Sequence, residues 1–302
     1  MMKLKRLFFL RQRKRRNMGC ITAVSSCQEI QQKQSRSGYI TSTARCGLIY
    51  TLKGFVFMKN MRVTYLNHSG FLVETEGWNL LFDYFPDDAA PGEPGYLTPE
   101  QLPRDKGLAV FVSHSHHDHF YAGLSDWQKA RPDLLLFCSS ETPLPPSPNT
   151  FPMEGDAGMQ LTWETGRPPL QVSTLPSTDL GVAFLVKAGD FSLYHAGDLN
   201  DWYWEGEPEA ENAAMSAAYA AQMEKLRGLH FDAAFLPMDP RQEQDYLRGI
   251  LGFWKVCRAD AVFPMHFWGN YDVFDQMEAD SRAACFRGAV RRISHRGEIF
   301  VL

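Results

Sequence analysis

The 302-residue sequence lacks the features that would place it in a membrane or in an oxidising compartment. It contains no run of about 18 apolar residues, which excludes a transmembrane helix. Its first apolar stretch, residues 7–10, is shorter than the roughly 7–15 residues of a secretory signal and runs straight into arginines. The six cysteines include no Cys-x-x-Cys pair, so neither a disulfide framework nor a thiolate zinc site is indicated. We therefore expect a cytoplasmic protein with no membrane partner.

Acidic residues are nearly missing from the first 59 residues. This segment holds 13 Lys and Arg against a single acid, Glu29, for a net charge of +12, whereas the remaining 243 residues carry −16. Clustered Lys and Arg attract the phosphates of nucleic acids or membrane surfaces. The other interpretation is that the segment takes no part in the fold and that translation starts at Met58 or Met61. We predict a disordered basic extension over residues 1–59 and a folded domain over residues 60–302.

From residue 61 onward, short apolar segments alternate with turn residues. Three β-rich segments come first, at 63–66, 71–74 and 80–83, separated by turns at 67–70 and 76–77. We expect later strands at 108–112, 134–137, 182–186, 191–194, 233–236, 261–263 and 299–302, and helices at 209–226, 242–256 and 273–286. Strands followed by alternating strands and helices predict a layered α/β domain.

A cluster of histidines follows the apolar segment 108–112. The segment His114-x-His116-x-Asp118-His119 brings imidazoles and a carboxylate together, and these are ligands that zinc and similar divalent ions favour. In an extended segment His114 and His116 point the same way, while Asp118 and His119 come where the chain turns toward a helix. The spacing predicts two neighbouring metal sites. His117 faces away from these side chains, and we do not expect it to be a ligand.

This pattern resembles the HxHxDH motif of the metallo-β-lactamase superfamily of metal-dependent hydrolases. The opening segment 63–83 resembles the first hairpin of its lactonase-like and ribonuclease Z-like branch. The resemblance implies an α/β fold, a four-layer αββα sandwich over residues 60–302. It also implies that Asp198, in His195-Ala196-Gly197-Asp198, bridges both metals, and that His266, in Phe263-Pro264-Met265-His266, is the last ligand histidine. The second metal site would then comprise Asp118, His119, Asp198 and His266.

One ligand of the family pattern is missing, because no histidine occurs between His119 and His195. Asp179 is the foremost substitute, Ser177 and Thr178 are alternatives, and a water is another. A carboxylate in place of an imidazole hardens the site and favours Mn2+ or Fe over Zn2+. We expect two divalent metal ions, Zn2+ foremost, with Mn2+ or Fe as the alternatives.

Two further histidines have roles that the pattern leaves open. His195 lies three residues before Asp198, so on a regular strand it faces the other way and is expected to support the site rather than to bind metal. The resemblance places His68 at the mouth of the site, where it either orients a ligand or substrate or stabilises a turn.

The expected chemistry is hydrolysis by a metal-activated water, with Asp118 both binding metal and accepting or relaying a proton. The sequence has neither a Gly-x-Ser-x-Gly elbow nor a Walker loop, in keeping with this expectation. Trp202, Trp204 and Trp268 flank predicted ligands, where they either stack on the substrate or pack the loops.

The acidic body disfavours polyanions, so we predict a small-molecule substrate: an ester, a lactone or a phosphoester. Two alternatives remain open. One is a nucleic-acid phosphodiesterase aided by the basic arm, and the other is a non-catalytic metal-binding or sensor protein. The sequence does not indicate an oligomeric state. Arg241, in Met238-Asp239-Pro240-Arg241, is expected either near an anionic group or in a structural salt bridge.

Overall fold

A computed structural model describes residues 7–8, 60–163 and 166–302. The predicted basic extension over residues 1–59 lies outside the described residues, apart from strand β1 (Leu7–Phe8). None of the described helices is both long and apolar enough to cross a membrane.

The described part of the chain contains two mixed sheets of seven strands each. The first has the order β1-β8-β9-β10-β11-β12-β13 and the second the order β14-β2-β3-β4-β5-β6-β7. The first sheet contains β8 (Gly158–Leu161), β9 (Leu170–Pro176), β10 (Val182–Ala188), β11 (Phe191–His195), β12 (His230–Pro237) and β13 (Arg258–Met265). The second contains β2 (Arg62–Asn67), β3 (Gly70–Glu74), β4 (Trp78–Phe82), β5 (Gly107–Val112), β6 (Leu135–Ser139), β7 (Thr150–Met153) and β14 (Ile299–Val301).

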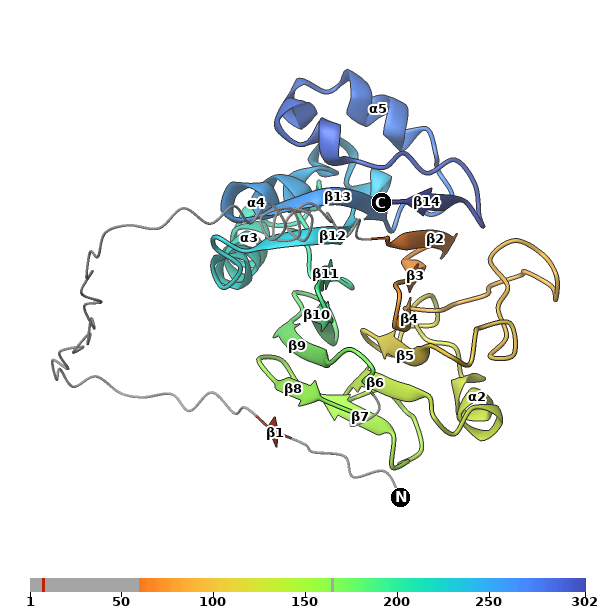
Figure 1. The fold of residues 1–302 in the computed structure, drawn as a ribbon. Helices are drawn as coiled ribbons and strands as arrows, with labels where there is room; N and C mark the ends of the chain where they lie inside the picture. The colour runs from red at the N-terminus through yellow and green to blue at the C-terminus, as the bar shows by residue number, and fades with distance from the viewer. Residues whose placement is uncertain (1–6, 9–59, 164–165) are drawn as a thin grey trace, which may run out of the picture. The chain divides into compact units, whose positions relative to one another are not determined.

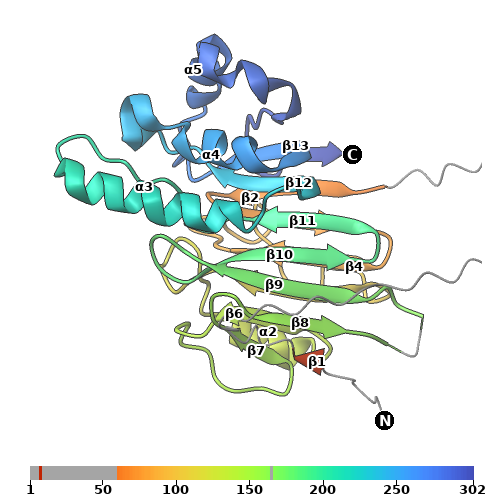
Figure 2. The same ribbon diagram turned by 90° about the vertical axis from the view of Figure 1, so that its left-hand side faces the viewer.

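The two sheets stack face to face, and helices cover their outer faces (Figure 1). Helices α3 (Glu209–Glu224) and α4 (Arg248–Val256) lie on the first sheet, and Figure 2 shows α3 running across it. Helix α2 (Leu124–Ala130) lies on the second sheet, and α5 (Val273–Ala279) lies at the end of the sandwich beyond β13. The predicted four-layer αββα sandwich is confirmed.

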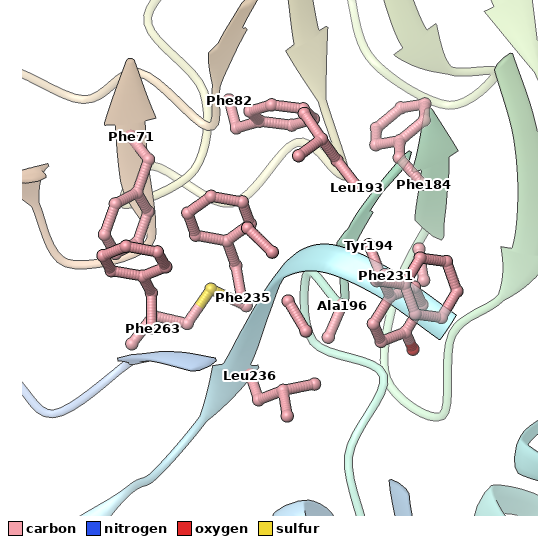
Figure 3. Packing of buried hydrophobic residues seen from close by; sticks show 14 of the residues in the cluster. Phe71, Phe82, Phe184, Leu193, Tyr194, Ala196, Phe231, Phe235, Leu236 and Phe263 are labelled. Carbon is pink, nitrogen blue, oxygen red and sulfur yellow. The ribbon is translucent and has the colours of Figure 1, made fainter. Parts of the chain in front are cut away.

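The core between the sheets is rich in phenylalanine. Phe71 and Phe82 of the second sheet meet Phe235 of the first, with ring centroids 4.7 and 5.8 Å apart (Figure 3). Alternate residues of β4 and β5 point into this core, and those between them pack toward α2 in a second cluster with Leu124 and Trp127. Strands buried on both faces read as nearly continuous apolar runs, which is why their sequences predicted them well.

Two predicted helices are wrong in extent. The helix expected over 242–256 begins only at Arg248, as α4; a 3₁₀ segment (Pro240–Asp245) precedes it, and Glu243 within that segment has a non-helical φ of 52°. The helix expected over 273–286 ends at Ala279, and Asp280 then adopts an extended conformation and caps a separate 3₁₀ turn (Ser281–Cys285). Strands β7, β8 and β9 and helix α2 were not predicted.

Parallel pairing places the predicted ligands at one edge of the sandwich. Strand β4 pairs in parallel with β5, and β11, β12 and β13 are parallel to one another. Loops that leave the carboxyl ends of parallel strands meet at the same edge. The residues that follow these ends are Asp83, His114, Asp198, Asp239 and His266.

Candidate metal centre

Two groups of potential metal ligands lie at this edge of the sandwich. Within each group, one donor atom from every residue lies within 4.8 Å of the others. The first group consists of His114, His116, Asp179 and Asp198, and the second of His68, Asp118, His119 and His266. The structure thus brings together all six predicted metal ligands, together with two of the three residues whose ligation was left open.

Asp198 faces both groups through its two carboxylate oxygens. Its Oδ2 lies 3.5 Å from Nε2 of His114 in the first group. Its Oδ1 lies 3.3 Å from Nε2 of His119 and 3.5 Å from Nε2 of His266 in the second. A carboxylate in this position can bind one cation through each oxygen, which is the geometry of a bridging ligand.

Asp179 completes the first group, where the family pattern has its missing histidine. Its Oδ2 lies 3.9 Å from Nδ1 of His116, which in turn lies 3.0 Å from Nε2 of His114. The two alternatives are engaged elsewhere: the Thr178 hydroxyl donates to the carbonyl of Asn200, and the Ser177 hydroxyl accepts from the Asp179 amide.

The second group is entirely buried and includes His68. The His68 ring packs 4.3 Å from that of His266, and its Nε2 lies 3.2 Å from Oδ2 of Asp118. His68 sits in the turn between β2 and β3, and the family resemblance placed it at the mouth of the site without deciding whether it contacts the ligand groups. Tertiary packing alone brings it there.

His195 and His117 lie outside both groups. The His195 ring stacks on Phe82 at 5.0 Å, and its Nε2 donates to the carbonyl of Ser69 at 2.9 Å. This places His195 in the core beside the site, where it links β11 to the β2–β3 turn. The His117 side chain is 83% exposed and points into solvent.

Two buried carboxylates hold two of the candidate ligand histidines in place. Asp83 accepts hydrogen bonds from the Ser113 amide and hydroxyl, each at 2.7 Å, and from Nδ1 of His119 at 2.8 Å. Asp239 accepts from Nδ1 of His266 at 3.0 Å. A histidine that donates from one ring nitrogen to a carboxylate presents the other nitrogen's lone pair to a metal. Sequence reasoning missed both roles, although each aspartate follows a strand as the ligands do.

Several residues of the two candidate ligand groups, or next to them, have strained backbone conformations. Seven described residues other than glycine have positive φ, and four of them are His68 (48°), Asp83 (39°), His266 (64°) and Trp268 (53°). Such conformations cost of order 1–3 kcal/mol each and persist where the surrounding structure enforces them. Their concentration around the two groups favours a functional site over a chance cluster.

The polar atoms of the centre fit a pair of divalent cations. Nε2 of His68, Nε2 of His119 and Oδ1 of Asp198 are buried and have no hydrogen-bond partner. Unpaired buried polar atoms are costly, and these three belong to the two ligand groups. Nitrogen and carboxylate oxygen donors in sets of four suit zinc and neighbouring divalent metals.

The electrostatics of the centre balance acids against imidazoles. Burial alone would lower the pKa of His266, but the carboxylates of Asp198 and Asp239 beside it raise that pKa to about 9. Burial lowers the pKa of His68 to about 4. For Asp118, burial would raise the pKa, but the contact with His68 and the charge of His119 hold it below its usual range.

A cavity of about 190 Å³ opens beside the centre. Its lining is Asp179, Asp198, Trp202, Trp204, Met215, Arg241 and His266. Trp202 is buried and donates from Nε1 to the carbonyl of Asp198 at 2.8 Å, so this ring also supports a ligand. Trp204 stacks on it at 5.8 Å and is half-buried. Trp268 is 46% exposed, and its ring lies 4.4 Å from that of His68.

Comparison with known proteins points to one family. The sequence model of the Beta-lactamase superfamily domain matches residues 62–203. A UPF0173 metal-dependent hydrolase of Carboxydothermus hydrogenoformans is 29% identical over 162 residues, which is 47% of this chain and 64% of that protein. Another of that name, from Ignicoccus hospitalis, is 26% identical over 231 residues, 74% of this chain and 88% of that protein.

A solved structure shows the same fold. A metallo hydrolase from Ignicoccus hospitalis aligns with a TM-score of 0.52 at 17% identity, covering 80% of this chain and 98% of that one. The chain matches 64% of the length of the Carboxydothermus relative, which is less than two thirds, so the similarity applies only to the aligned part of that protein.

Proposed function

We propose that the chain is a metal-dependent hydrolase of the metallo-β-lactamase superfamily that acts on a small ester, lactone or phosphoester. The observation that carries the proposal is the pair of ligand groups joined by Asp198. The fold by itself does not determine a substrate, so the argument rests on the site.

The first cation would be held by His114, His116, Asp179 and Asp198, and the second by Asp118, His119, His266 and Asp198, with His68 in reach. Zn2+ suits the second set, which has two or three imidazoles. The extra carboxylate of the first set makes it harder and favours Mn2+ or Fe there.

The chemistry follows from what these side chains hold in place. Two adjacent divalent cations polarise an acyl or phosphoryl oxygen and lower the pKa of coordinated water toward neutrality. Asp198 sets the distance between the two positions, and Asp83 and Asp239 orient His119 and His266. Asp118 is buried at the edge of the centre, with Oδ2 3.2 Å from Nε2 of His68, where it is placed to accept or relay a proton. The Trp268 ring packs 4.4 Å from that of His68, where it would restrict the access of bulk water to this side of the centre.

A small substrate is favoured over a polyanion. The chain from residue 60 onward carries 16 net negative charges, which repel nucleic acid, and the cavity beside the centre is only about 190 Å³. The described cysteines, Cys138, Cys257 and Cys285, are free thiols, and we propose a reducing cytoplasm as the compartment.

Metal content and hydrolysis, measured together, test the function. The purified protein should hold two equivalents of divalent metal and hydrolyse 4-nitrophenyl acetate or bis(4-nitrophenyl) phosphate. Asp198→Ala should lose both cations and turnover, whereas His117→Ala, in the neighbouring but exposed position, should keep both. Fewer than one equivalent in the wild type, together with no hydrolysis of either ester, would show a non-catalytic protein. Unchanged activity and polyanion binding after deletion of residues 1–57 would exclude the nuclease alternative.

A further inference from the structure

Arg241 lines the cavity beside the metal centre and is the only arginine or lysine among its lining residues. It follows β12 in the 3₁₀ segment that replaces the start of the predicted helix. Its side chain is 51% exposed, whereas the carboxylate of Asp239 that it contacts is completely buried. A half-exposed guanidinium at the wall of a cavity can meet a ligand without being displaced from its anchor.

One edge of the Arg241 guanidinium is used for anchoring. Its Nε donates to both oxygens of Asp239 at 3.0 and 2.9 Å, and its Nη2 donates to Oδ2. Oδ2 of Asp239 also accepts from Nδ1 of His266, so one buried carboxylate fixes both a ligand histidine and the arginine. The other edge, at Nη1, has no hydrogen-bond partner among residues 60–163 and 166–302.

The chain contains a second copy of this local arrangement, which shows what is different at Arg241. Arg282 bonds to Asp280, two residues earlier, through its amide, Nε and Nη2, in the same pattern. At that place Nη1 is engaged, since it donates to the carbonyl of Gln244 at 2.8 Å. The Arg282 guanidinium therefore donates hydrogen bonds from Nε, Nη1 and Nη2. Within the described part of the chain, the Arg241 guanidinium donates only from Nε and Nη2.

Two tryptophans restrain the plane of the Arg241 guanidinium, whose Nη1 edge is open. The Arg241 Cζ lies 4.7 Å from the ring centroid of Trp268 and 5.8 Å from that of Trp204. Stacking on aromatic faces restrains a guanidinium and leaves its edge N–H groups free to donate. Trp202 and Trp204 line the cavity and offer apolar surface to the part of a ligand that joins the anion to the reacting group.

We propose that Arg241 forms an anion subsite, which binds a carboxylate or phosphate oxyanion on the substrate at a distance from the scissile bond. The inference rests on the proposed function and adds the substrate class: a small molecule with one anionic group and a flat apolar portion. Arg241 would determine specificity through binding. Asp179 and Asp198 face the same cavity, but a pair of cations in the centre would offset their charge.

Ligand binding without turnover provides the test. Zinc-loaded wild type, Arg241→Gln, Arg241→Lys and the matched control Arg282→Gln are titrated with 4-nitrobenzoate, phenylphosphonate and the uncharged 4-nitrobenzamide, and tryptophan fluorescence is followed. The wild type and Arg282→Gln should bind one or both anions about tenfold or more tightly than the amide, the size expected for a hydrogen bond to a charged group. Arg241→Gln should lose that preference while keeping its affinity for the amide, and Arg241→Lys should keep part of it.

The outcomes separate the sources of the anion and the failure of each proposal. Preference for the benzoate assigns a carboxylate, and preference for the phosphonate assigns a phosphate. An anion preference that survives in Arg241→Gln, equal loss of amide binding in that variant, or no preference in the wild type overturns the subsite. The absence of ester hydrolysis overturns the hydrolase function instead and leaves this binding measurement intact.

Discussion

Replacing Asp83 with asparagine would test whether the buried carboxylates orient the candidate ligand histidines for metal binding. Oδ2 of Asp83 receives two donors, the Ser113 hydroxyl at 2.7 Å and Nδ1 of His119 at 2.8 Å, and Oδ1 receives the Ser113 amide. Asparagine has the same shape but presents one NH2 group in place of an oxygen. Either orientation of its amide therefore sets a donor against a donor.

The effect on His119 can be worked out from its two ring nitrogens. If the asparagine amide nitrogen faces Nδ1, His119 relieves the clash by carrying its proton on Nε2 instead. Nε2 of His119 is the ring nitrogen that faces Asp198 and would bind the metal of the second group. A protonated nitrogen has no lone pair for a metal. Loss of such an orienting partner lowers metal affinity roughly 10- to 100-fold. Leaving a buried donor unpaired lowers the free energy of unfolding by about 1–3 kcal/mol.

Zinc competition against a chelating indicator measures the affinity, and urea unfolding of the metal-free protein measures the stability. Asp201→Asn is the matched control, because this buried carboxylate bonds to Ser216 and Arg248 and touches no ligand of either group. The control should lose stability and keep its zinc. Wild-type zinc affinity in Asp83→Asn would refute the assigned role, since the tautomer of His119 would then not depend on Asp83.

Two further substitutions test the segment that carries Asp179. Asp179→His, which restores an imidazole, should raise the zinc affinity of the first group and reduce its relative affinity for manganese. Unchanged metal preference by mass spectrometry would show that Asp179 is not a ligand. Gly181→Ala should cost more than about 2 kcal/mol in urea unfolding, because φ is +74° and a Cβ there would overlap the Ser113 carbonyl. Gly228→Ala, with φ +78° and open space around it, should cost only about 1 kcal/mol, and equal losses would contradict the close approach.

Much of the site could be predicted because most of its candidate ligands directly follow the ends of buried strands. His114, His116, Asp118 and His119 follow a strand whose six residues are all buried, and such a strand is readable from its apolar run. Asp198 follows another strand end in the same way. Nothing local marks Asp83 as different, since its role depends on His119, which is 36 residues away in the sequence.

The parts that could not be predicted depend on contacts distant in sequence or on backbone conformation. The family resemblance placed His68 at the mouth of the site but left its role open. Its place in the second group depends on the packing of its turn against the end of β13, where the His266 amide bonds to the His68 carbonyl. The helix expected from residue 242 fails because the Asp239 side chain caps the turn at Arg241 and Glu243 takes a left-handed φ. Hydrophobic periodicity gives no information on either feature. The weakly apolar strands β7 and β8 have four residues each, which is too short for a period to show.

The two ligand groups are not equivalent, and their difference follows from how each side chain is supported. In the second group every residue is buried, and His119 and His266 are each held by a carboxylate. In the first group His116 and Asp179 are 51% and 48% exposed and contact each other at 3.9 Å. Exposed, weakly restrained ligands lose more conformational freedom when a metal binds, and orienting partners strengthen a site. A protein that holds one equivalent of metal should therefore hold it in the second group, with Asp198 already positioned for the first.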